Sequence, residues 1–219
     1  MGNKKIVGTV AALVIVAAAG FLWVSLVGLS PRVDLRPHEA LGEVLAQEAL
    51  KQLGAGGRVF LVQRDTVLHP NPAAAAQVRV FLRMLRRAGV SVAGTNVVKI
   101  DPLRVVSAPP ADFFQLLRKA SETDVVVSFL GPPVLNADQL AKLGGKTPKV
   151  VAVCSGAMPN QVNLKRAFEL KLLHTAVLSR VDVTGNSPPA VGAEAWFDRY
   201  FLLATSADTM TPPSTPERK

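Results

Sequence analysis

The sequence has few of the residues that build redox, metal and nucleic-acid sites. Cys154 is the single cysteine, so no disulfide can form within the chain. The three histidines are far apart, and neither HExxH nor CxxC spacing occurs, so we predict no metal site and no other cofactor. Aromatic residues make up only 5% of the chain, too few for a platform on which single-stranded nucleic acid stacks. We therefore expect no nucleic-acid partner.

Charge is absent from the whole stretch between Lys5 and Arg32. Residues 6–29 form an apolar run that exceeds the roughly 20 residues needed to cross a bilayer. This run predicts a single-pass transmembrane helix, with the lipid bilayer as its partner. A signal peptide cleaved after the small residues 17–19 is an alternative, although the apolar run continues beyond them. A buried helix of a soluble protein is a third interpretation.

The orientation of this segment follows from its flanks. Two lysines precede it and two arginines follow it, so counting positive charges gives nearly a tie. A very short N-terminal tail before a long apolar run is typical of a signal anchor. We therefore predict a plasma (inner) membrane protein with residues 1–5 in the cytoplasm and residues 38–206 outside it.

Positive charge predominates in the rest of the chain, and the formal net charge of the whole is +9. Such a bias favours anionic neighbours, such as lipid headgroups, envelope polymers or a small anionic ligand, although it also serves solubility. One stripe of an expected helix carries four arginines: Arg79, Arg83, Arg86 and Arg87. This stripe is either a solvated helix face or an electrostatic binding surface.

Short apolar runs alternate with amphipathic segments along residues 38–206. We expect strands over 58–62, 124–130, 149–154, 175–183 and 201–205, with two shorter pieces within 90–100. We expect helices over 38–53, 73–88, 109–121, 136–143, 159–171 and 194–200. Residues 30–37 are predicted to be a linker and residues 207–219 a disordered tail. The alternation predicts an α/β fold: a doubly wound, mostly parallel sheet with helices on both faces.

Three of these runs, with their flanks at 58–65, 123–131 and 149–156, resemble strands in one lobe of the periplasmic binding-protein-like α/β domains. In that family, paired lobes close on a small ligand. The resemblance covers residues 58–205 and implies a ligand-binding role. We expect the chain to be too short for two lobes, and hence for a cleft between two lobes.

Ligands of doubly wound sheets bind at the carboxyl ends of the strands. The residues at these ends that we predict to bind a ligand are Arg64, Asp65, Gly131 and Ser155. They lead to the hypothesis of a non-enzymatic module of the cell envelope that binds a ligand or a partner protein, or has a structural role. The alternative is a hydrolase-like or transferase-like enzyme that uses Cys154 or Ser155 as nucleophile with His174 as base. The sequence leaves the oligomeric state open.

Overall fold

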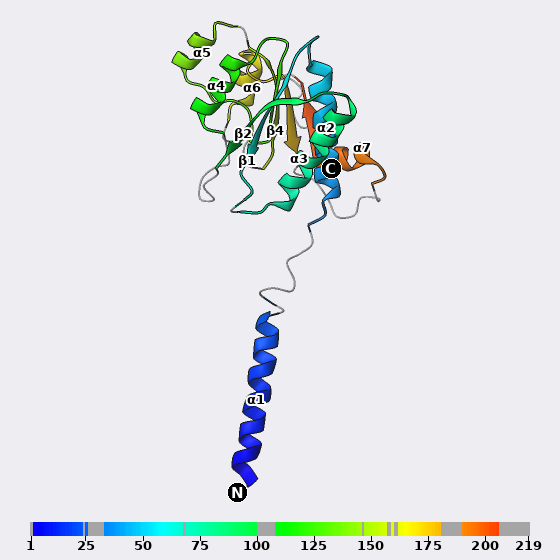
Figure 1. Ribbon diagram of the computed structural model, residues 1–219, viewed down its shortest axis with the longest axis vertical. Coiled ribbons are helices and arrows are strands. Elements are labelled where there is room, and N and C mark those ends of the chain that lie inside the picture. Colours follow the sequence, from blue (N-terminus) through cyan, green and yellow to red (C-terminus); the bar gives the residue numbers. More distant parts are fainter. Residues whose placement is uncertain are drawn as a thin grey trace, which may run out of the picture. The chain divides into compact units, whose positions relative to one another are not determined.

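In the computed structural model, the chain is divided into two compact units, Met1–Asp34 and Leu35–Lys219 (Figure 1). The structure describes residues 2–23, 25, 33–67, 69–99, 108–145, 147–156, 159, 162–180 and 190–205. Residues 30–32 of the expected linker at 30–37 and the whole expected tail at 207–219 lie outside the described residues.

The first unit contains one long helix, α1, which spans Gly2–Trp23. Its side chains are described from Leu13 to Trp23, and all of these are exposed. Over the described residues, we find no helix with the length and apolar character that crossing a membrane requires. The described residues therefore do not support the transmembrane segment predicted over residues 6–29.

The second unit is organised around a six-stranded sheet with the order β2-β1-β3-β4-β5-β6. Its strands are β1 (Val59–Arg64), β2 (Val92–Val98), β3 (Val125–Ser128), β4 (Lys149–Cys154), β5 (Thr175–Ser179) and β6 (Phe201–Ala204). The first five pair in parallel, and β6 pairs with β5 antiparallel. The predicted α/β class and the mostly parallel sheet are confirmed.

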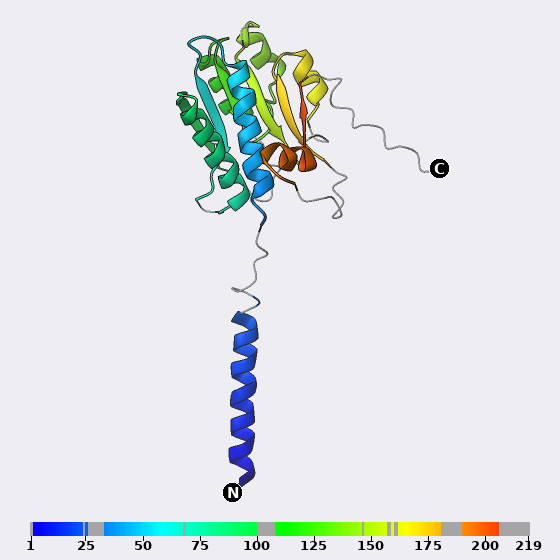
Figure 2. The same ribbon diagram turned by 90° about the vertical axis from the view of Figure 1, so that its right-hand side faces the viewer.

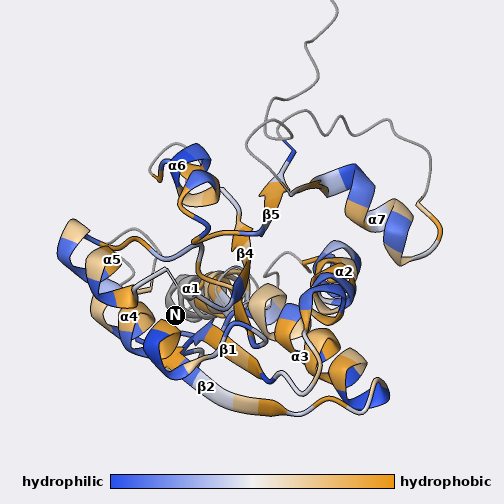
Figure 3. Cartoon of the chain, turned by 90° about the horizontal axis from the view of Figure 1, so that it is seen from above, coloured by the Kyte–Doolittle hydropathy of each residue, from blue (hydrophilic) through white to orange (hydrophobic). Residues whose placement is uncertain are grey.

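Three helices cover each face of this sheet (Figure 3). The helices α2 (Arg36–Gln52), α3 (Pro72–Arg87) and α7 (Ala193–Tyr200) pack on one face. The helices α4 (Pro110–Lys119), α5 (Ala137–Leu143) and α6 (Leu164–Glu169) pack on the other. Because strand side chains alternate between faces, Val59 and Leu61 join the first layer, whereas Phe60 and Val62 join the second. The strands are therefore apolar on both faces.

Local sequence signals explain where most helices begin and end. The Asn71 side chain accepts a hydrogen bond from the amide of Ala74 and so caps α3. Asn136 and Gln139 form a reciprocal capping box at the start of α5, and Gly144 ends that helix in the left-handed conformation. The helix α2 begins at Arg36, so Pro37 lies in its first turn and not in the expected linker. Proline is accepted there because its missing N–H has no partner within a helix.

Three other expected elements differ more clearly from the structure. The expected helix over 159–171 is limited to α6, which starts only after Asn163 caps it. The strand expected over 175–183 ends at Ser179, and residues 181–189 lie outside the described part. The two pieces expected within 90–100 form one continuous strand, β2. Gly94 lies within that strand. A Cβ at this position would be only 3.2 Å from the Cδ1 of Phe60, so the absence of a side chain lets the strand pass close to the Phe60 ring.

Candidate functional site

The strand order places a topological switch point between β1 and β3. The chain leaves β1 through α3 to β2 on one side and reaches β3 on the other side of β1 through α4. Helices following neighbouring strands then diverge to opposite faces, which opens a crevice at the carboxyl ends of those strands. This edge of the sheet is therefore the first place to look for a ligand site. Figure 2 shows α2, α3 and α7 in front of the sheet.

The predicted site residues all lie at this carboxyl edge. Arg64 is the last residue of β1, and Asp65 follows it. Gly131 comes shortly after β3, is buried, and has a φ of +85°, a conformation that favours glycine. Ser155 follows β4 and is exposed. Since Val62 pairs with Ser128 and Ser128 with Ala152, the three strands end at nearly the same level.

Asp65 has a structural role in the turn after β1. Its amide donates a hydrogen bond to the carbonyl of Val98 at 2.8 Å, which extends the pairing of β1 with β2. Its Oδ1 accepts a hydrogen bond from the amide of Val67 at 2.9 Å. This local bond is the usual way in which an aspartate stabilises a turn.

A cavity of about 410 Å³ opens beside Arg64, between the end of β1 and α3. Such a volume lies within the range of about 300–1,000 Å³ that is usual for small-molecule sites. Its polar lining includes Gln63, Arg64, Thr66, Gln77, Arg79 and Arg86. Its apolar lining includes Val78, Leu82 and Phe129. Of the four residues predicted from the sequence, Arg64 lines this cavity, whereas Asp65, Gly131 and Ser155 are not among its lining residues.

Arg64 is the one charged residue of this site with a buried polar atom that lacks a partner. Among the described residues, its Nε atom is the single buried side-chain nitrogen or oxygen without a hydrogen bond. Leaving such a donor unsatisfied costs about 1–3 kcal/mol, and more for charged groups. The part of the chain that is described thus carries an uncompensated cationic donor at the switch point. A ligand that accepts a hydrogen bond from this guanidinium would remove the cost.

Phe129 forms a fixed apolar wall of the cavity. Its ring meets the ring of Phe81 edge-on, with 5.6 Å between the centroids and an interplanar angle of 85°. Phe81 is fully buried in the core, so this contact holds the Phe129 ring in place. The sequence alone did not indicate Phe129, Thr66 or Gln63 as site residues. Their proximity to strand ends was visible in the sequence, but their common neighbour, α3, was not assigned to this edge.

The catalytic alternative requires Cys154 or Ser155 to meet His174, and the fold separates them. Cys154 ends β4, whereas the His174 Nδ1 accepts a hydrogen bond from the amide of Val150 at 3.1 Å, near the start of the same strand. Four residues of strand correspond to about 13 Å at roughly 3.3 Å per residue. Cys154 is also fully buried, and burial raises the pKa of its thiol to about 12. The predicted pair of Cys154 with His174 is wrong, because Cys154 packs as a core residue.

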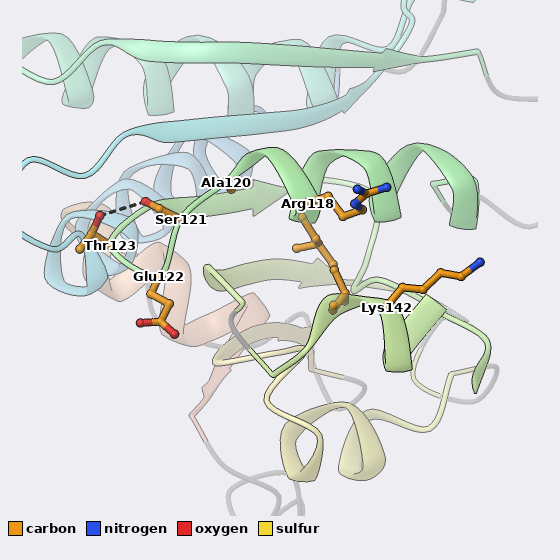
Figure 4. Close-up of a pocket in the computed structure, with 8 residues that line it drawn as sticks. Arg118, Ala120, Ser121, Glu122, Thr123 and Lys142 are labelled. Carbon is orange, nitrogen blue, oxygen red and sulfur yellow. Dashed lines mark hydrogen bonds between the residues drawn. The ribbon is translucent and has the colours of Figure 1, made fainter. Parts of the chain in front are cut away.

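Two other hollows are less suited to a ligand. The larger, of about 520 Å³, lies at the amino ends of the strands, where Ser121–Thr123 precede β3 (Figure 4). Its charged groups do not converge: Figure 4 shows Glu122 and Lys142 extending in different directions. The other, of about 450 Å³, lies between β2 and α4. Within the described ranges, no group of three His, Cys, Asp or Glu side chains is placed to hold a metal ion.

Comparisons with known proteins gave matches to solved structures alone. No family model matches the chain, and no curated protein matches it. Among solved structures, a periplasmic ribose ABC transporter protein from Conexibacter woesei matches with a TM-score of 0.45 and 13% identity, over 64% of this chain and 45% of that one. A carbohydrate-transporter solute-binding protein from Agrobacterium radiobacter, in complex with D-arabinose, matches with a TM-score of 0.42 and 13% identity, over 65% and 47%.

A periplasmic component of an ABC-type sugar transport system from Hahella chejuensis matches with a TM-score of 0.45 and 14% identity, over 65% and 49%. The chain therefore spans about half the length of the solved structures it matches. The matches include periplasmic sugar-transport proteins, the class of protein whose single lobe the strand pattern resembles.

Proposed function

We propose that the domain beginning at Leu35 is a non-enzymatic module that binds a small ligand at the carboxyl edge of its sheet. The observation that carries this proposal is the buried, unpartnered Nε of Arg64 beside a cavity of about 410 Å³. The cavity also offers a fixed aromatic wall, Phe129, and the polar side chains of Gln63 and Thr66. A cavity that combines an apolar wall with polar side chains is a usual form of a small-molecule site.

The proposed site is flanked by Asp65, Gly131 and Ser155. They follow β1, β3 and β4 at the same edge, although they do not line the cavity. A ligand longer than the cavity would extend across the ends of these strands toward the exposed Ser155. An envelope protein as partner stays a prediction from the sequence.

A cavity-filling variant tests this proposal. Ala75 lines the cavity from an exposed position of α3, so Ala75→Phe fills the space without entering the core. The matched control is Gln47→Phe, which adds the same ring at an exposed position of α2 that does not line the cavity. The full chain and both variants are screened against a metabolite panel by thermal unfolding, because a ligand that binds the native state raises Tm.

We expect at least one metabolite to raise the Tm of the wild type and of Gln47→Phe, but not that of Ala75→Phe. A metabolite that stabilises all three proteins equally binds elsewhere and contradicts the assignment of the site. A panel without any stabilising compound contradicts ligand binding itself.

We also propose that α1 tethers this module to the plasma membrane, with residues 1–5 in the cytoplasm. The support is the lack of charge between Lys5 and Arg32 in the sequence, together with the helical backbone over Gly2–Trp23. The described side chains from Leu13 to Trp23 are exposed, and a bilayer would cover them. Extraction of cell membranes with alkaline carbonate tests the tether.

The full chain is expected in the carbonate-resistant pellet, whereas a variant carrying both Leu13→Arg and Val16→Arg is expected in the extract. Recovery of a soluble product that begins after residues 17–19 would instead establish a cleaved signal peptide. Digestion of spheroplasts with protease gives the orientation, because an extracytoplasmic domain is degraded and a cytoplasmic one is protected.

A further inference from the structure

We infer that the ligand of the cavity beside Arg64 is a small organic anion, held through a carboxylate or phosphate group by the Arg64 guanidinium. This inference rests on the proposed function and adds the chemical class of the ligand. It starts from the charges around the cavity. The charged lining residues are Arg64, Arg79 and Arg86, and no aspartate or glutamate is among the residues that line it. The cavity therefore offers a field of one sign, which favours negative charge.

Arg64 is the residue best placed to form the primary contact. Its guanidinium sits at the switch point of the sheet, with Nε buried and without a hydrogen-bond partner. A guanidinium presents Nε–H and Nη–H in a planar fork, which matches the two oxygens of a carboxylate or phosphate. An anionic group of a ligand in the cavity would give Nε the hydrogen-bond acceptor that it lacks. A neutral ligand supplies a weaker acceptor for the same donor.

The two other arginines differ in how far they are already neutralised. The Arg79 Nη2 lies 2.8 Å from the Glu39 Oε1, so this charge is partly balanced by an ion pair. Arg86 lies two turns further along the same helix face and also lines the cavity. The ion pairs of the described residues do not include Arg86. Arg64 and Arg86 thus supply most of the positive charge that a ligand meets.

The arginine stripe of α3 is therefore divided by the fold. All four arginines are exposed, but Arg79 and Arg86 line the cavity, whereas Arg83 and Arg87 do not. This division gives a matched control within one helix. Arg83 has the same charge, the same helix and an exposed position, but it lies outside the cavity.

The remaining wall indicates an organic ligand in place of a bare inorganic ion. Val78, Leu82 and Phe129 form an apolar side of the cavity beside the charged groups. A cavity of about 410 Å³ is also much larger than a phosphate ion needs. The size and chemistry fit a carbon skeleton against Phe129 with one anionic group near Arg64.

Isothermal titration of the full chain in detergent tests this inference with four probes: glucose 6-phosphate, gluconate, glucose and inorganic phosphate. The two organic anions separate a phosphate from a carboxylate as the recognised group. Glucose removes the charge, and inorganic phosphate removes the carbon skeleton. We expect one of the organic anions to bind, with glucose and inorganic phosphate at least tenfold weaker. We also expect added salt to weaken binding of the anion.

Arg64→Gln is expected to weaken binding of the anion by roughly 10–100-fold, as for loss of a charge-assisted hydrogen bond. Arg83→Gln is expected to leave it within about twofold, because an exposed charge outside the cavity is screened. Circular dichroism of both variants confirms that they fold, since neither side chain belongs to the buried core.

If glucose binds as tightly as the anions and Arg64→Gln has no effect, the ligand is not recognised as an anion, although ligand binding itself still holds. Equal affinity for inorganic phosphate and the organic anions would overturn the organic part. If Arg83→Gln weakens binding as much as Arg64→Gln does, the effect of charge is unspecific, and the assignment of the contact to Arg64 is overturned. No binding of either organic anion also overturns the inference, and the metabolite panel then decides separately whether the module binds a ligand.

Discussion

The carboxylate of Asp124 accepts hydrogen bonds from both the backbone and the side chain of Arg58. Asp124 Oδ1 lies 2.7 Å from the Arg58 amide, and Oδ2 lies 2.9 Å from the Arg58 Nη2. Oδ2 also accepts from the Ser121 amide at 2.7 Å. Asp124 is almost fully buried, at 1% exposed. This single carboxylate therefore joins the start of β1 to the start of β3, across 66 residues of sequence.

Replacement of Asp124 by alanine is expected to lower the free energy of unfolding by about 3 kcal/mol or more. The change leaves two backbone donors near β1 and β3 without their acceptor, at about 1–3 kcal/mol each. Urea unfolding followed by circular dichroism measures the loss. The neighbouring Glu122→Ala, at an exposed position, is the control and is expected to change stability by less than about 0.5 kcal/mol. Equal effects of the two variants would show that the Asp124 contacts contribute nothing special.

The same contacts predict a loss of stability in acid. Burial alone would raise the pKa of Asp124, but the hydrogen bonds from Arg58 and Ser121 outweigh it and hold the pKa well below its usual range. A depressed pKa means that this stabilisation is present above about pH 4 and is lost as pH falls further. Urea midpoints of the wild type should therefore fall below pH 4 more steeply than those of Asp124→Ala. If the urea midpoints of the two proteins fall equally steeply below pH 4, the loss of stability in acid does not come from Asp124.

His174 predicts a second pH dependence, in a higher window. Burial lowers the pKa of His174 to about 4, and the charges of Lys149 and Lys171 act in the same direction. The unfolded chain binds a proton near pH 6.5 and the folded chain does not, so stability falls as pH decreases from about 6.5 toward 4. The slope of the urea midpoint between about pH 6.5 and 5 measures this effect. His174→Asn should flatten that slope, and an unchanged slope would assign it to other groups.

The contact between α2 and α3 predicts that Gly42→Ala is destabilising. A Cβ at residue 42 would overlap the backbone oxygen of Gln77, so the two helices would have to move apart. Overpacking of this kind costs about 1–3 kcal/mol. Helix propensity alone predicts the opposite sign, since alanine is better than glycine by about 1 kcal/mol in a helix. If Gly42→Ala is more stable than the wild type in thermal unfolding, the close contact is refuted. The control is the difference in stability between Gln47→Gly and Gln47→Ala, which measures helix propensity at an exposed position of α2.

Cys154 is expected to be inert toward thiol reagents in the folded protein. It is fully buried, its Sγ lies 3.9 Å from the carbonyl oxygen of Ala152, and burial raises the pKa of its thiol to about 12. Because the thiolate is the reacting form, labelling with a chromogenic disulfide should require unfolding. The comparison is a variant with Cys154→Ala and Ser155→Cys, which moves the thiol to an exposed position and should react within minutes. Rapid labelling of native Cys154 would restore the nucleophile hypothesis.

Most of the helices and strands, and the α/β class, could be predicted from the sequence. Apolar runs such as Val125–Ser128 are too short for helices and lack a polar face, so they are strands buried on both sides. Asn71, Asn136 and Gly144 mark helix ends through bonds to their own neighbours. These signals are local, and a single sequence contains them. The long uncharged run also predicted a membrane span over residues 6–29, which the described residues do not support.

The order of the strands, and the residues beside each strand end, depend on tertiary packing and could not be predicted from the sequence. Placing β1 between β2 and β3 creates the switch point at Arg64. The helix α3 packs beside it and brings Arg79 and Arg86, and Phe129, which follows β3, forms the apolar wall. The same packing buries Cys154 and keeps it away from His174. Strand order and helix contacts are set by pairing and close packing between residues that are distant in the sequence. Hydrophobic periodicity is the same for several such arrangements, so it cannot choose among them.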